Sequence, residues 1–120
     1  MKDYNMDLHM PLVEAVLAYK KENVYPLHTP GHKGGRGMEP SLKKLLGESV
    51  QVDVSLMSEL DDIHEPESYI KEAQELAAKV YQSDACFWAV NGTTEAIQAM
   101  LLLACNPNDT VLIPRNAHRS

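Results

Sequence analysis

Residues 85–118 read ACFWAVNGTTEAIQAMLLLACNPNDTVLIPRNAH, and this stretch predicts a strand, a helix and a second strand. Its first six residues are apolar and rich in β-formers, and the turn pair Asn91-Gly92 stops them. Thr93 or Thr94 can cap the helix, whose apolar positions recur at helical spacing until Asn-Pro-Asn-Asp at 106–109. Residues 110–114 then form the second predicted strand.

A crossover helix between two strands places them parallel in one sheet, so their carboxyl ends share an edge. Residues 91–94 follow the first predicted strand, and residues 115–118 follow the second. Open α/β sheets bind ligands at this edge. The fold class we expect is therefore α/β, with a mostly parallel sheet and a candidate site at 91–94 and 115–118.

The turn at 91–94 has the composition of a phosphate-binding turn. A helix N-terminus offers unpaired N–H groups and partial positive charge. Gly92 would let an anion approach the backbone, and the hydroxyls of Thr93 and Thr94 would add donors. The same residues also make an ordinary helix cap, and the pattern alone does not separate the two interpretations.

Charge and hydropathy disfavour several classes of partner. The net charge of −6 disfavours binding to nucleic acid or to an anionic membrane, since both require clustered Lys and Arg. The longest apolar run, 99–105, is far too short to span a bilayer, and the N-terminus lacks the apolar core of a signal peptide. Cys86 and Cys105 are expected to be buried free thiols, which fits a reducing cytoplasm, and two isolated cysteines predict no zinc site.

Before residue 85 we expect three helices, over residues 10–22, residues 40–46 and residues 68–81, because Pro11 and Pro40 suit first turns and apolar residues recur at helical spacing. Residues 50–54 alternate like a short strand. The helix at 10–22 could pack on the main body or contribute to a dimer. The helix at 68–81 should pack its apolar stripe against the sheet.

Two loops before residue 85 contain reactive residue types. Residues 26–37 hold glycines, prolines and the cations Lys33 and Arg36, so the loop could receive an anion or be a solvated linker. Its His28 and His32 lack a third ligand at suitable spacing, which disfavours a metal site. Residues 61–65 gather three carboxylates around His64, either as a solvated loop or facing a cationic substrate or a partner subunit.

Five runs in order resemble the start of the Orn/Lys/Arg decarboxylase family: LHTPGHKGG at 27–35, LDDIHEP at 60–66, IKEAQELA at 70–77, VNGTTEAIQAM at 90–100 and PRNAHRS at 114–120. The resemblance implies the aspartate-aminotransferase fold of pyridoxal phosphate enzymes. Residues 1–38 would then be an arm helix with a Gly/Pro-rich loop. Residues 39–120 would begin an incomplete, three-layer α/β/α cofactor-binding major domain.

The resemblance also implies the site. Gly92, Thr93 and Thr94 match the family's phosphate-binding turn, and His118 matches the histidine that stacks on the cofactor ring. No residue here matches the family's catalytic lysine or its ring-nitrogen aspartate, both of which lie downstream in the family. The chain is therefore expected to be an N-terminal fragment, inactive alone, of a short form without a wing domain.

The function implied is pyridoxal phosphate-dependent decarboxylation of arginine, lysine or ornithine to a polyamine precursor. The enzyme is expected to be cytoplasmic and at least a homodimer, with no metal, nucleic acid or membrane partner. Two alternatives remain open: another enzyme of the same fold, such as an aminotransferase or lyase, and a non-catalytic truncated module. The glycine-rich motif at 27–35 argues against the first, although the sequence does not choose among the three substrates.

Overall fold

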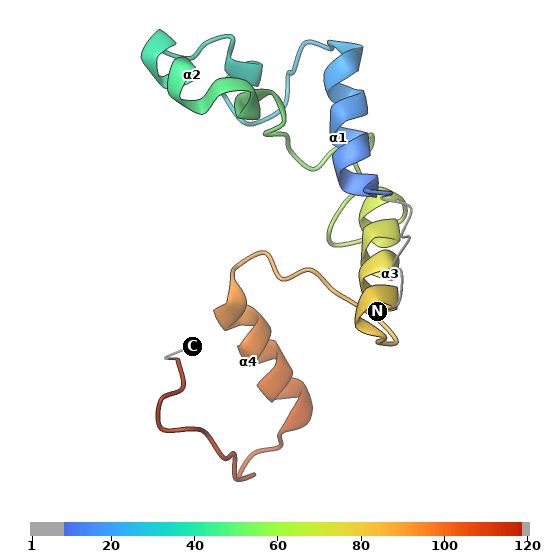
Figure 1. Ribbon diagram of the computed structural model, residues 1–120, viewed down its shortest axis with the longest axis vertical. Coiled ribbons are helices and arrows are strands. Elements are labelled where there is room, and N and C mark those ends of the chain that lie inside the picture. Colours follow the sequence, from blue (N-terminus) through green and yellow to red (C-terminus); the bar gives the residue numbers. More distant parts are fainter. Residues whose placement is uncertain (1–8, 119–120) are drawn as a thin grey trace, which may run out of the picture. The chain divides into compact units, whose positions relative to one another are not determined.

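A computed structural model describes residues 9–118, and the chain divides into two compact units, one ending at Cys86 and the other beginning at Phe87 (Figure 1). The first unit contains α1 (Pro11–Glu22), the short 3-10 helix η1 (Lys33–Gly35), α2 (Pro40–Leu46), a second 3-10 helix η2 (Gly47–Gln51) and α3 (Tyr69–Tyr81). The second unit contains α4 (Thr93–Ala104). The domain boundary expected at residues 38 and 39 stays a prediction.

The four predicted α-helices are confirmed to within about two residues. Pro11 and Pro40 each stand at the first helical position, where a missing N–H costs nothing. Asn23 ends α1 in the left-handed region, at φ 50° and ψ 36°. The predicted strand over 50–54 is not formed, because Val50 is buried within η2 instead.

Helices α1 and α3 pack against each other and bury Ala15, Ile70 and Ala78. The apolar stripe of α3 thus lies against α1, whereas we expected it to lie against a sheet. An amphipathic stripe requires an apolar partner but does not specify which element supplies it. The contact gives α1 a packing role in its own unit.

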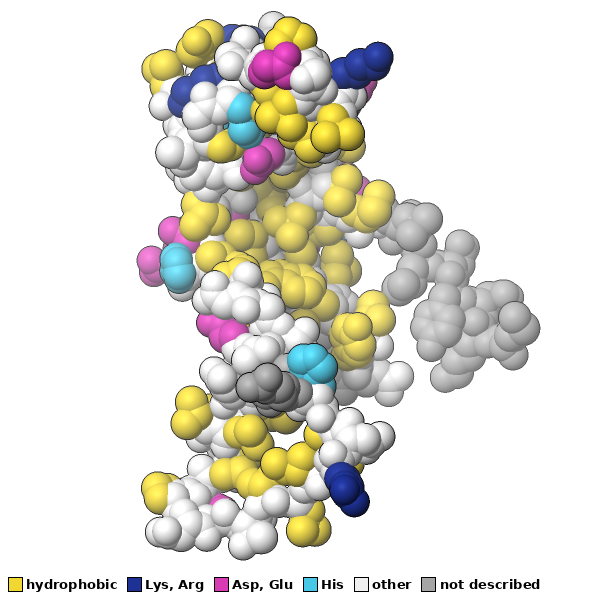
Figure 2. All heavy atoms as spheres, turned by 90° about the vertical axis from the view of Figure 1, so that its left-hand side faces the viewer, with side chains coloured by type: hydrophobic (Ala, Val, Ile, Leu, Met, Phe, Trp, Pro, Cys, Tyr) yellow, Lys and Arg dark blue, Asp and Glu magenta, His cyan; other side chains and the backbone are white. Residues whose placement is uncertain are grey.

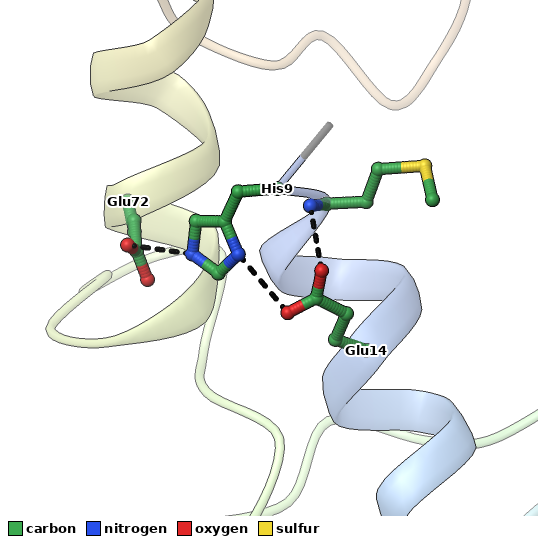
Figure 3. A network of polar contacts seen from close by, with 4 residues as sticks. His9, Glu14 and Glu72 are labelled. Carbon is green, nitrogen blue, oxygen red and sulfur yellow. Dashed lines mark hydrogen bonds and ion pairs between the residues drawn. The ribbon is translucent and has the colours of Figure 1, made fainter. Parts of the chain in front are cut away.

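A polar contact also joins the two helices (Figure 3). The ring of His9 has Nδ1 3.0 Å from a carboxylate oxygen of Glu14 in α1 and Nε2 2.9 Å from one of Glu72 in α3. The hydrogen bond to Glu72 is the main cause that raises the pKa of His9 above its ordinary value, and the charge of Glu14 adds to it. Protonated His9 therefore links α1 to α3.

Asp61 anchors the start of α3. Its side chain is buried, and Oδ1 accepts hydrogen bonds from the backbone N–H of Asp62 at 2.9 Å and Glu67 at 3.0 Å. Oδ2 accepts from the N–H of Ser68 at 3.0 Å and Ile70 at 2.8 Å. Ser68 precedes the helix without capping it through its own side chain, so Asp61 supplies the cap from seven residues earlier.

The charge of Asp61 is stabilised by this arrangement. Burial opposes ionisation, but the N–H groups of Glu67, Asp62, Ile70 and Ser68 outweigh it and hold the pKa of Asp61 well below its ordinary value. The residue itself has a positive φ of 81° and forms an isolated antiparallel bridge with Met57. A strained, buried aspartate thus fixes the chain that leads into α3.

In the second unit, α4 forms as expected, but Gly92 rather than Thr93 or Thr94 is its N-cap residue. The predicted strands at 85–90 and 110–114 are not formed, and the part of the chain described here contains no β-strand. A strand needs a neighbouring strand for its hydrogen bonds, and these two segments do not pair with each other. The expected parallel sheet is therefore not confirmed.

The apolar side chains of this second unit are largely open to solvent (Figure 2). Leu103 is 90% exposed and Leu112 is 93% exposed. Apolar residues lie on all sides of α4, a pattern typical of helices that are buried on every face. The second unit thus has the apolar composition of a protein core, but its apolar side chains are not covered by other parts of residues 87–118.

Candidate functional site

The turn at 91–94 follows the apolar segment 85–90 and leads directly into α4. Gly92 has φ 89° and ψ 173°, a backbone conformation that is essentially restricted to glycine. A Cβ added at Gly92 would meet no atom within 4 Å, so the space beside this backbone is open. Thr93 and Thr94 occupy the first two helical positions, and both are exposed.

The hydrogen-bond donors of this turn fall into two sets. Glu95 accepts from the backbone N–H of Asn91 at 3.0 Å and from its side-chain amide at 3.1 Å. The N–H groups of Thr93 and Thr94 and their hydroxyls have no acceptor within residues 87–118. The carboxylate of Glu95 therefore satisfies the donors before the helix and leaves the first helical turn open to an anion.

His118 lies beyond α4, after a tight turn in which the N–H of Ala117 donates to the carbonyl of Pro114 at 3.0 Å. The residue is exposed. In the view of Figure 1, the chain after α4 returns toward the end of the helix at which Thr93 lies. The turn residues and His118 thus belong to one compact unit, and the assignment of His118 to the site stays a prediction.

The glycine-rich loop at 26–37 lies in the other unit and is held by several polar contacts. Nε2 of His28 lies 3.1 Å from the hydroxyl of Tyr19, and Nε2 of His32 lies 3.1 Å from a carboxylate oxygen of Asp53. Nδ1 of His32 is buried without a hydrogen-bond partner within the described range. In residues 9–118, no three His, Cys, Asp or Glu side chains form a group that could hold a metal ion.

The acidic loop at 61–65 agrees in part with the solvated interpretation. Asp62 and Glu65 are exposed, whereas Asp61 is only 7% exposed and is bound by backbone N–H groups. The alternative, that the loop faces a cationic substrate or a partner subunit, stays a prediction. Asp62 accepts from the N–H of His64 at 2.8 Å. Asp61 is therefore structural, a role that the sequence does not indicate, since Ser68 stands directly before α3 as a usual N-cap residue.

Cys86 and Cys105 are free thiols, as predicted, although both are half-buried rather than buried. No helix within residues 9–118 is long and apolar enough to cross a membrane.

The sequence profile described as "Orn/Lys/Arg decarboxylase, major domain" matches residues 10–120 of this chain. The chain therefore belongs to the Orn/Lys/Arg decarboxylase family. This match includes the open turn at 91–94, the loop at 26–37 and His118 within one family region.

The chain is similar to several proteins of that family. It is 40% identical over 111 residues to the arginine decarboxylase of Bacillus cereus, a match that covers 92% of this chain and 24% of the relative. It is 39% identical over 111 residues to the arginine decarboxylase of Bacillus subtilis, with 92% and 23% covered. It is 31% identical over 117 residues to the inducible lysine decarboxylase of Escherichia coli, with 92% and 16% covered.

The chain spans about a quarter of the length of the arginine decarboxylases it matches. No solved structure matches it significantly.

Proposed function

We propose that the protein containing this chain decarboxylates a basic amino acid, arginine, lysine or ornithine, to an amine that serves as a polyamine precursor. The observation that carries the proposal is the family match over residues 10–120, together with the open helix start that lies inside it. Some relatives are named arginine decarboxylase and others lysine decarboxylase, which supports a basic amino acid as substrate but does not identify which one.

Pyridoxal 5'-phosphate is the cofactor we assign to this protein. The residues present fit its phosphate, because the backbone beside Gly92 is open and the first turn of α4 keeps unused donors. When bound, this cofactor supplies an electron sink that accepts the electron pair released as CO2 leaves. Its binding residues here would be Gly92, Thr93, Thr94 and His118.

The chain's own residues would bind and orient the cofactor. Gly92 allows close approach of the backbone, while the N–H groups and hydroxyls of Thr93 and Thr94 donate to a dianion at a helix N-terminus. Holding the phosphate at this rigid point fixes the rest of the cofactor relative to the substrate. His118 would cover one face of the ring and exclude water from it.

The same proposal includes a homodimer or a higher homo-oligomer. The support is the family's N-terminal arm, to which α1 corresponds in position. In this structure α1 buries Pro11 and Ala15 but leaves Val13 and Leu17 exposed on its surface, so apolar area remains for a second subunit.

The activity is tested on the purified whole protein by measuring CO2 release from arginine, lysine and ornithine, with and without added pyridoxal phosphate. We expect release from at least one of the three, dependent on the cofactor, and no release from glutamate. His118→Ala should lower turnover while the melting temperature changes little, since the residue is exposed beyond α4.

Absence of CO2 release from all three amino acids, in protein that binds the cofactor, would contradict the proposed reaction. Transfer of an amino group to a keto acid under the same conditions would assign the protein to the aminotransferases of the same fold.

A further inference from the structure

A pocket of about 300 Å³ lies between α1, the glycine-rich loop and α2, inside the unit that ends at Cys86. Its lining includes Lys20, Lys33, Arg36 and Lys43, four of the eleven Lys and Arg residues of the chain. Asp53 is the one acidic residue in its described lining. In a chain of net charge −6, this pocket concentrates positive charge.

Three of these cations lack a carboxylate partner among residues 9–118. Lys20 is neutralised by Glu48 at 2.8 Å. Lys33, Arg36 and Lys43, by contrast, make no ion pair with any residue in the described part of the chain.

The two cations of the glycine-rich loop are positioned by neutral groups. The ammonium of Lys33 donates to the carbonyl of His28. Arg36 donates to the side-chain oxygen of Asn23 at 3.4 Å and lies over the ring of Tyr25, 4.8 Å from its centroid. Both cations therefore keep their charge and further N–H donors for a ligand.

The stem of Lys43 lies against the glycine-rich loop at Gly35. Gly35 is buried with φ 80°, and a Cβ built on it would lie 3.3 Å from Cγ1 of Val50, which is tight, and 3.6 Å from Cε of Lys43, which is ordinary van der Waals contact. The loop that carries Lys33 and Arg36 therefore approaches Lys43 closely. In Figure 2, Lys and Arg side chains appear at separate places near the top of the view, the end at which α2 lies in Figure 1.

We propose that this cation pocket binds a small organic dianion, either a phosphate monoester or a dicarboxylate. Lys33, Arg36 and Lys43 lie close together without an ion-pair partner among the described residues, so a ligand with about two negative charges would suit them. Arg and Lys side chains bind both phosphate and carboxylate groups. Val24, Pro26 and Val54 supply an apolar wall for the carbon part of the ligand. The volume lies at the lower end of the range for small-molecule sites, about 300–1,000 Å³.

The pocket would repel the cationic tail of a basic amino acid, and it shares no residue with the turn at 91–94. The inference therefore goes beyond the proposed decarboxylase activity and does not depend on it.

Isothermal titration calorimetry on the purified whole protein tests the pocket, with glycerol phosphate and succinate as separate probes. We expect one of them to bind, with an affinity that falls as NaCl is raised. Replacing Lys33, Arg36 and Lys43 together by Gln should raise its Kd at least about tenfold, because three charged donors are lost. Competition between the two probes identifies whether phosphate or carboxylate is preferred.

The matched control replaces Lys21, Lys71 and Lys79 by Gln, which removes the same charge outside the pocket. Its Kd should stay within about twofold of the unmodified protein. Lys43→Gln and Lys44→Gln form a milder pair on α2, of which only the first should weaken binding.

Each titration is repeated with pyridoxal phosphate added. Unchanged probe binding supports a separate site. Displacement of the probe by the cofactor, no heat from either probe, or equal losses in the pocket and control variants would each overturn the proposal.

Discussion

Helices α3 and α4 are nearly equal in length, at 13 and 12 residues, and neither is capped by the side chain of its own N-cap residue. The buried carboxylate of Asp61 accepts hydrogen bonds from the N–H groups at the start of α3. The apolar face of α3 packs on α1. The start of α4 keeps its donors, and its apolar side chains are exposed.

The difference shows how one physical requirement is met in two ways. Each helix begins with unpaired N–H groups and partial positive charge, which favour an anion. For α3 the chain supplies its own anion, so that helix start is structural. For α4 the carboxylate of Glu95 binds Asn91 instead, and the first turn remains available to an external anion.

The largest expected effect comes from removing the internal anion of α3. Asp61→Ala leaves four backbone N–H groups without their acceptor and should lower the free energy of unfolding by about 3–5 kcal/mol. Chemical denaturation of the whole protein measures the loss. Asp62→Ala is the control, because this exposed carboxylate accepts from one N–H only.

The dependence of stability on pH gives an independent check on the anchoring role of Asp61. Since its pKa is depressed in the folded state, its stabilisation is present above the ordinary Asp pKa of about 3.9 and is lost as pH falls through the folded value. The Asp61→Ala protein should therefore show a weaker loss of stability on acidification. An equal loss in both proteins would contradict the anchoring role.

Truncating an apolar side chain in each helix compares their burial. Ile70→Ala in α3 should cost about 2–4 kcal/mol in the 120-residue chain, because Ile70 is 7% exposed. Leu103→Ala in α4 should change stability by no more than about 0.5 kcal/mol there, because Leu103 is 90% exposed. Urea denaturation followed by circular dichroism measures both.

The same pair of substitutions should behave differently in the whole protein. If further strands cover α4 there, Leu103→Ala will cost about as much as other buried leucines, roughly 2–5 kcal/mol. A small effect in both contexts would show that α4 is a surface helix.

Gly92→Ala tests the backbone at the start of α4. At φ 89° and ψ 173° an alanine is strained by about 1–3 kcal/mol, so the turn should open and the affinity for pyridoxal phosphate should fall about tenfold. Equilibrium dialysis of the whole protein measures the Kd. Gly31→Ala, where no positive φ is imposed and no atom lies within 4 Å, should leave it unchanged.

The smallest effect concerns His9, between α1 and α3. Its pKa is raised, so the stabilisation it gives is fully present below its ordinary pKa of about 6.5 and is lost as pH rises through the folded value. An NMR titration should find the pKa of His9 above the ordinary histidine value of about 6.5, and Glu72→Gln should lower it. A pKa of His9 at or below that ordinary value would contradict the bridge.

The helices could be predicted from the sequence because their signals are local. Pro11 and Pro40 mark helix starts, and the apolar period of 68–81 indicates a buried stripe. The partner of that stripe and the cap of α3 could not be predicted, since both depend on residues distant in sequence. In the sequence, nothing distinguishes Asp61 from the neighbouring acidic residues. Only the fold places its carboxylate at the N–H of Ile70.

The two predicted strands, in contrast, depend on residues that are distant in sequence. Residues 85–90 and 110–114 have strand-like composition, but hydrogen-bonded strands require neighbours, and a local pattern does not create them. The turn at Gly92 and the helix after it could be predicted, whereas the hydrogen bonds from Asn91 to Glu95 could not. The role of the turn in binding stays a prediction. The distribution of donors in this turn follows from side-chain geometry that composition does not encode.

The central claim is that the open start of α4 receives the phosphate of a cofactor, and the affinity of the whole protein for pyridoxal phosphate tests it most directly. Thr93→Val with Thr94→Val removes two hydroxyl donors and should raise the Kd at least about tenfold. The control, Thr29→Val with Thr110→Val, removes the same groups elsewhere and should leave the Kd within about twofold. An unchanged Kd in the Thr93 and Thr94 variant would contradict the claim.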